Sequence, residues 1–85
     1  MQTLESQTLH SLAATRTGEF VEIKKILFST LRAHCADLDI AEGDVLRCRA
    51  GTPSQLVLET KHGRIVSLQR DWARFIQVTN PIVAA

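Results

Sequence analysis

Residues 45–78 read VLRCRAGTPSQLVLETKHGRIVSLQRDWARFIQV and decide the fold of this chain. Within this stretch, apolar side chains alternate with polar ones in four short segments. Such alternation predicts β-strands that each bury one face. Turn-forming residues separate the first three segments, at 51–54 and 61–63. The side chains expected to point inward are Leu46 and Cys48, Leu56 and Leu58, Val66 and Leu68, and Ile76 and Val78.

Three further features accompany these strands. Residues 69–73 lie between the third and fourth segments, and they predict one turn of helix. Upstream, residues 21–28 predict an additional strand whose apolar face changes phase at Lys24-Lys25. A phase change within a strand indicates a β-bulge, and we expect Ile26 and Phe28 to continue the apolar face beyond it. Before that strand, residues 9–13 predict a short turn or helix that packs on the domain.

One helix is expected between the first strand and the other four. Leu31, Cys35 and Leu38 stand at positions i, i+4 and i+7, which form one stripe of a helix. We expect this helix to span about Thr30 to Asp37, with Ser29 or Thr30 as its N-cap. Gly43 then ends the segment in a turn, where glycine can take a positive φ.

These signals together predict a mostly β fold. We expect a small barrel of about five strands, with one short helix after the first strand and a helical turn before the last. A barrel is favoured because closing a short sheet removes its exposed edges. The domain should occupy residues 8–79, between a flexible N-terminal tail at 1–7 and a C-terminal tail at 80–85.

Composition narrows the classes of function. The chain has 85 residues, a formal net charge of +1 and 5% aromatic residues. This balance gives no basic footprint for nucleic acid, so no nucleic-acid partner is expected. No apolar run approaches the roughly 20 residues of a membrane helix, so no membrane insertion is expected. The N-terminus lacks the pattern of a signal peptide, which predicts a cytoplasmic protein with reduced cysteines.

Four stretches of the chain, in order, carry a resemblance to a known family. Each combines apolar positions with a glycine or alanine, and the four are residues 8–12 followed by Gly18-Glu19, residues 36–45, residues 63–70 and residues 73–78. In this order they resemble the FeoA family, the ferrous iron transport protein A domain. Asp39 departs from the pattern, because the family usually has glycine there. Asp can adopt the left-handed conformation at some cost.

The resemblance implies both a fold and a role. The fold would be an SH3-like barrel, which also forms the C-terminal domain of DtxR-type iron- and manganese-dependent repressors. The role would be that of a non-enzymatic accessory or regulatory protein of ferrous iron transport. Its partner would be the cytosolic part of the membrane transporter FeoB. The alternatives are a small barrel that binds nucleic acid and a metal-responsive regulator, and the oligomeric state stays open.

The sequence offers little support for catalysis or for a metal centre. The candidate ligands do not stand at C-x-x-C or H-x-x-x-H spacing, and they are His10, His34, Cys35, Cys48 and His62. We expect both cysteines to be core residues. Ser67 has no evident base, so no catalytic residue is predicted. We therefore expect no enzyme activity and no cofactor, although an iron-linked role makes Fe(II) a candidate ligand.

Basic residues and one tryptophan form the predicted partner-binding set. Arg47 and Arg49 share the outward face of one strand, and Arg70 and Arg74 flank Trp72 near the last strand. They form either an ordinary solvated surface of mixed charge or an arginine-rich docking face for an acidic partner. Trp72 is either a plug at one end of the barrel or an interface hot spot, and we favour the plug.

Overall fold

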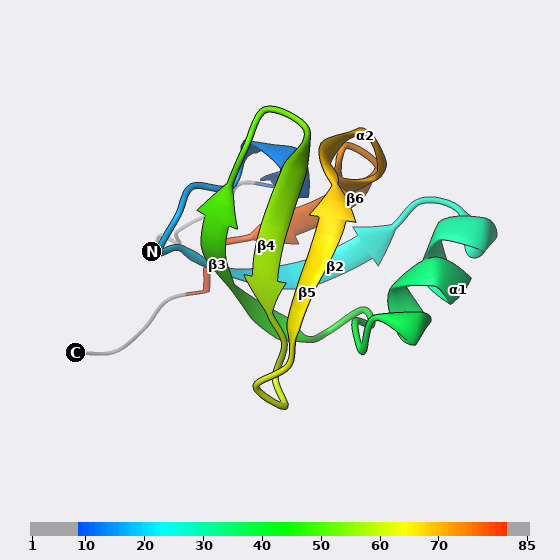
Figure 1. Ribbon diagram of the computed structural model, residues 1–85. Helices are drawn as coiled ribbons and strands as arrows, with labels where there is room; N and C mark the ends of the chain where they lie inside the picture. Colours follow the sequence, from blue (N-terminus) through cyan, green and yellow to red (C-terminus); the bar gives the residue numbers. More distant parts are fainter. Residues whose placement is uncertain (1–8, 82–85) are drawn as a thin grey trace, which may run out of the picture.

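The computed structural model describes residues 9–81, which form a six-stranded antiparallel sheet with two α-helices and a 3-10 helix (Figure 1). The predicted N-terminal tail at 1–7 lies outside the described residues, and so does most of the predicted C-terminal tail at 80–85, from residue 82 on. The elements are β1 (His10–Ser11), η1 (Leu12–Ala14), β2 (Phe20–Ile26), α1 (Ser29–Asp37), β3 (Val45–Gly51), β4 (Gln55–Glu59), β5 (Ile65–Gln69), α2 (Arg70–Ala73) and β6 (Ile76–Thr79).

The strands follow the order β1-β6-β2-β3-β4-β5 across the sheet. The mostly β fold and the position of both helices are confirmed, but there is one more strand than predicted. The additional strand, β1, has two residues and pairs with β6, opposite Val78 and Gln77. The predicted bulge is also confirmed, because the register between β2 and β6 shifts between Ile23 and Lys25. This bulge lets Val21, Ile23 and Ile26 all reach the interior.

The core consists of the alternate positions that the sequence pattern predicts. All eight inward-facing side chains of the last four predicted strands are buried. Leu12 of η1 and Leu31 and Cys35 of α1 join them, together with Ile40 and Ala73. The prediction for Phe28 is wrong, because β2 ends at Ile26 and Phe28 is 50% exposed.

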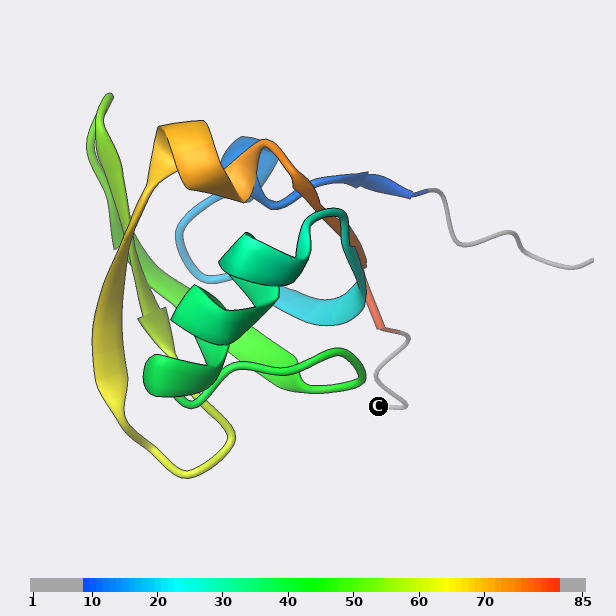
Figure 2. The same cartoon turned by 90° about the vertical axis from the view of Figure 1, so that its right-hand side faces the viewer.

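The helix α1 lies across the opening of the curved sheet (Figure 2). It begins at Ser29, and its N-cap is Phe28, which makes no side-chain capping hydrogen bond. The predicted cap at Ser29 or Thr30 is therefore wrong by one or two residues, since α1 begins at Ser29, only three residues after the end of β2 at Ile26. Leu31 and Cys35 bury one stripe of α1, and Leu38 packs against the core beyond its end.

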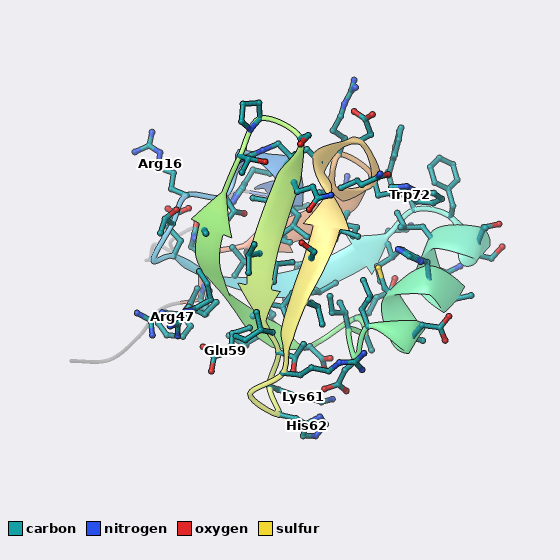
Figure 3. All side chains as sticks on the ribbon, viewed as in Figure 1. Arg16, Arg47, Glu59, Lys61, His62 and Trp72 are labelled. Atoms are coloured by element: carbon teal, nitrogen blue, oxygen red, sulfur yellow. The ribbon has the colours of Figure 1, made fainter. Side chains whose placement is uncertain are left out.

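The short helix α2 contacts both β5 and η1, and so connects the two edge regions of the sheet. Trp72 lies on the outside of this helix with 37% of its surface exposed, so the plug interpretation is wrong (Figure 3). The physical reason is the register of a four-residue helix: the buried position falls on Ala73, which has no exposed surface. No helix within residues 9–81 is long and apolar enough to cross a membrane.

The turn after α1 depends on two residues with positive φ. Asp39 adopts φ 66° and Gly43 adopts φ 94°. The left-handed conformation costs a non-glycine residue free energy. At Asp39 the carboxylate offsets this cost, because Oδ2 accepts hydrogen bonds from Thr60 Oγ1 at 3.1 Å and lies 2.8 Å from His62 Nδ1. Asp39 therefore replaces glycine here and ties this turn to the β4–β5 turn.

Candidate protein-interaction surface

The five residues of the predicted partner-binding set do not form one surface. Arg47 and Arg49 lie on β3, whereas Arg70, Trp72 and Arg74 lie on or next to α2. Figure 3 shows Arg47 and Trp72 on opposite sides of the molecule. A single docking face that uses all five side chains is therefore inconsistent with the fold.

The two arginines of β3 are engaged with their own neighbours. The Arg49 guanidinium donates to Glu59 Oε1 on β4 at 2.8 Å. The guanidinium carbon of Arg47 lies 5.6 Å from the centre of the Phe20 ring, which is a cation–π arrangement. Both side chains remain exposed. This face is thus a surface of mixed charge in which opposite charges and a ring already compensate part of the positive charge.

The Arg70 side chain links two distant backbone segments of the fold. Its guanidinium donates hydrogen bonds to the backbone carbonyls of Thr52 in the β3–β4 turn and of Ala13 in η1. A Cβ atom at Gly51 would lie 2.6 Å from a terminal nitrogen of this guanidinium, so a larger residue there would displace the end of the Arg70 side chain. Nothing in the local sequence signals these contacts, since Ala13 and Arg70 are 57 residues apart.

A cluster of opposite charges, the charged end, joins the β4–β5 turn to the α1–β3 connection. We define it as Asp39, Asp44, Lys61 and His62, of which Lys61 and His62 are labelled in Figure 3. Asp44 is nearly buried, and it accepts from the backbone of Ala41 and from Lys61 Nζ, both at 2.9 Å. The hydrogen bond from His62 lowers the pKa of Asp39, and the Asp44 carboxylate raises the pKa of Lys61. The charged side chains of this end therefore pair with one another, Lys61 with Asp44 and His62 with Asp39.

Exposed apolar side chains gather away from the charged end, where the β2–α1 connection meets the start of β6. Figure 2 shows the course of these two backbone segments. Phe28 and Phe75 meet edge to face with ring centres 5.0 Å apart, and Leu27 N donates to Phe75 O. Trp72 precedes Phe75 by one turn and lies 5.5 Å from the His34 ring. We name this group the aromatic patch: Leu27, Phe28, His34, Trp72 and Phe75.

The aromatic patch contains most of the few phenylalanine and tryptophan residues of this chain. The sequence has three phenylalanines and one tryptophan, and all but Phe20 belong to the patch. Leu27, Phe28, Trp72 and Phe75 keep between 37% and 50% of their surface exposed. Clustered exposed apolar residues mark interaction sites in soluble proteins, and aromatic residues are enriched at interface hot spots. The pattern analysis missed this site because its residues come from segments 47 positions apart.

A shallow hollow of about 150 Å³ adjoins the aromatic patch. Its floor and rim combine apolar groups with two potentially cationic side chains, and the lining residues are Leu9, His10, Ser11, Leu27, Arg74 and Gln77. Of the predicted partner-binding set, Trp72 and Arg74 thus lie at this end of the molecule. Leu27 belongs to both the patch and the hollow, which makes them one continuous surface.

Both cysteines are core residues, as predicted, whereas His34 and His62 are exposed. Cys35 and Cys48 are both buried, and burial raises the pKa of the Cys35 thiol to about 11. Burial also raises the pKa of Cys48. Both thiols therefore remain protonated near neutral pH and are poor nucleophiles. Within residues 9–81, no three or more His, Cys, Asp or Glu side chains are grouped so that they could hold a metal ion.

Comparison with known proteins identifies the fold. No family model matches the sequence, and no curated protein matches it. Among solved structures, a FeoA-like protein from Clostridium acetobutylicum superimposes with a TM-score of 0.77 at 19% identity, over 95% of both chains. This chain has the FeoA fold. An iron uptake regulatory protein, FeoA, is also similar, with a TM-score of 0.78 at 13% identity over 87% of this chain and 99% of that one.

The FeoA fold also occurs as part of a longer protein. A manganese-dependent transcriptional repressor in complex with manganese matches with a TM-score of 0.79 at 20% identity. The match covers 89% of this chain and 38% of the repressor. Both groups of neighbours are those that the sequence motifs predicted, so the resemblance and the SH3-like barrel are confirmed.

Proposed function

We propose that this chain is a non-enzymatic accessory or regulatory protein of ferrous iron transport, located in the cytoplasm. Its partner would be the cytosolic part of a FeoB-type ferrous iron transporter. The FeoA fold supports this role, because the similarity to the FeoA-like protein extends over nearly the whole of both chains. The repressor match supports the same fold but does not favour a DNA-linked role, since it covers only 38% of that longer chain.

The observation that carries the proposal is the aromatic patch. A small barrel that acts by contact needs an exposed surface that gains free energy when it is covered. Leu27, Phe28, Trp72 and Phe75 provide such a surface, and the buried thiols do not. Burying apolar surface contributes about 25 cal/mol per Å², and hot-spot side chains carry most of that energy at an interface.

Uptake measurements in the native host test this role. We expect deletion of the gene to lower anaerobic uptake of radioactive ferrous iron, and the wild-type gene to restore it. A Phe28→Ser, Phe75→Ser double variant should accumulate as folded protein but fail to restore uptake. An Ile65→Ser variant is the matched control, since Ile65 is 56% exposed but lies on β5, outside the patch.

Co-purification supplies the second readout. Tagged full-length protein should retain the transporter's cytosolic region, and the double variant should not. Unchanged uptake after deletion, together with no retention of the transporter, would contradict the proposed function.

A further inference from the structure

Basic side chains border the aromatic patch on the side of the hollow. Arg74 and His10 line the hollow, and Lys25 lies opposite Gln77, another lining residue, in the β2–β6 register. Lys25 and Arg74 are both exposed, and neither takes part in an ion pair within residues 9–81. In contrast, Arg49 and Lys61 each have a carboxylate within 2.9 Å. Within the part of the chain that the structure describes, Lys25 and Arg74 therefore give the rim of the hollow positive charge that no carboxylate pairs with.

We infer that the aromatic patch and the basic hollow together bind an acidic segment of a partner protein that carries large apolar side chains. The inference deepens the proposed function, on which it rests, by naming the chemistry of the partner. Apolar side chains of the segment cover Phe28, Trp72 and Phe75, and one of them enters the hollow beside Leu27. A carboxylate of the segment pairs with Arg74, whose planar guanidinium suits bidentate contact with a carboxylate.

Charge complementarity favours a protein segment over a lipid surface. A membrane site of this kind usually presents several basic residues around its aromatic side chains. Here Asp71 stands in the first turn of α2, next to Trp72, and the whole chain carries a formal net charge of only +1. An anionic bilayer would repel Asp71, whereas a peptide can direct its carboxylates to Arg74 and Lys25 and avoid Asp71.

Selection from a peptide library tests the inference without the transporter. Full-length protein is immobilised and screened against random linear peptides displayed on phage at low ionic strength. We expect the selected peptides to be enriched in Leu, Phe or Trp flanked by Asp or Glu. Added to ¹⁵N-labelled protein, a synthetic copy of the best peptide should shift the backbone resonances of Leu27, Phe28, Trp72, Phe75 and Arg74.

Two variants with matched controls separate the apolar and electrostatic parts. Phe28→Ser should weaken binding of the peptide by about tenfold or more, as expected for a hot-spot residue. Its control is Ile65→Ser. Arg74→Glu should weaken binding several-fold at low salt and less at high salt, because screening reduces the electrostatic contribution. Its control is Arg64→Glu, in the exposed β4–β5 turn.

A charge swap gives the strictest test. A copy of the peptide with its Glu and Asp residues replaced by Lys should bind the wild type poorly and regain affinity for the Arg74→Glu variant. A substitution that merely damaged the fold could not produce this reversal. Vesicles of phosphatidylcholine with phosphatidylserine are tested in parallel and should not bind the protein.

In the peptide and vesicle experiments, any of four results would overturn the inference: no selected peptides, peptides without acidic enrichment, resonance shifts away from the patch, or binding to the anionic vesicles alone. If acidic peptides bind but deletion leaves uptake unchanged and the transporter does not co-purify, the proposed function is wrong and the inference holds. If the transporter binds but the patch variants leave its affinity unchanged, the inference is wrong and the proposed function holds.

Discussion

The charged end and the aromatic patch of this barrel differ in how far their side chains are paired or buried within the chain. At the charged end, Asp39, Asp44, Lys61 and His62 pair with one another across two turns. At the aromatic patch, Leu27, Phe28, Trp72 and Phe75 contact one another but remain 37–50% exposed. The charged groups of the first end form ion pairs within the chain, whereas the apolar side chains of the second end remain exposed to solvent. The difference indicates that the charged end stabilises the fold, whereas for the aromatic patch we propose a role in contact with another molecule.

The largest expected effect on the free energy of unfolding concerns β5, a strand between the charged end and the aromatic patch. Leu68 is 1% exposed, so Leu68→Ala should lower the free energy of unfolding by about 2–5 kcal/mol. Ile65 lies on the same strand at 56% exposure, and Ile65→Ala should change stability by less than about 0.5 kcal/mol. Urea unfolding of both variants measures the contrast. Equal effects would mean that the assignment of the interior and exterior faces of β5 is incorrect.

The next effect tests whether Arg70 belongs to the fold or to a docking face. Arg70→Ala removes two hydrogen bonds from a charged donor, so it should destabilise the protein by about 1–2 kcal/mol. Gly51→Ala should also destabilise the wild type, because its Cβ would collide with the guanidinium. In the Arg70→Ala background the same change should cost less, and a double-mutant cycle measures this coupling. Strictly additive costs would show that the two residues do not interact.

A smaller effect, tied to pH, is expected at the charged end. The pKa of Asp39 is lowered from 3.8, chiefly by the His62 hydrogen bond. A lowered pKa means that the stability contribution is present above pH 3.8 and is lost as the pH falls through the pKa of the folded state. Asp39→Asn removes the carboxylate but keeps a residue that tolerates a positive φ. The variant should lose less stability between neutral and acidic pH, measured by unfolding at several pH values.

The smallest effect on stability is expected at the aromatic patch. Phe28 is the N-cap of α1 and makes no side-chain capping bond, whereas serine is among the preferred residues there. Phe28→Ser should therefore leave the free energy of unfolding within about 0.5 kcal/mol of the wild type, or raise it slightly. Thermal unfolding provides the measurement. A large loss of stability would show that Phe28 supports the fold, and the contrast between the two ends would disappear.

Local patterns predicted most of the barrel. Alternation placed the inward-facing pairs of β3 to β6 correctly, because each pair is two positions apart and its burial depends on strand geometry alone. The bulge before Ile26 was recognisable from the same phase rule. The two-residue strand β1 was missed because a period cannot be detected over His10–Ser11.

The candidate site was harder to predict because it depends on distant segments. The patch forms only when the β2–α1 connection meets the start of β6, which brings Phe28 beside Phe75. For Trp72 the sequence left a plug and an interface hot spot as alternatives, with the plug favoured, but the register of α2 gives the buried position to Ala73. Trp72 and Arg74 fall at the proposed surface, whereas Arg47 and Arg49 lie on the far side and Arg70 holds the turns together.

The position of β6 has a consequence for how the chain acquires its structure. Residues 76–79 come last among the strands in sequence, yet they lie between β1 and β2 in the sheet. During synthesis, the hairpins formed by β3, β4 and β5 can pair as soon as they emerge, whereas β1 has no neighbour until β6 arrives. Phe75 emerges just before β6, so the aromatic patch is completed together with the sheet. The complete patch is therefore exposed only by a chain whose sheet has formed.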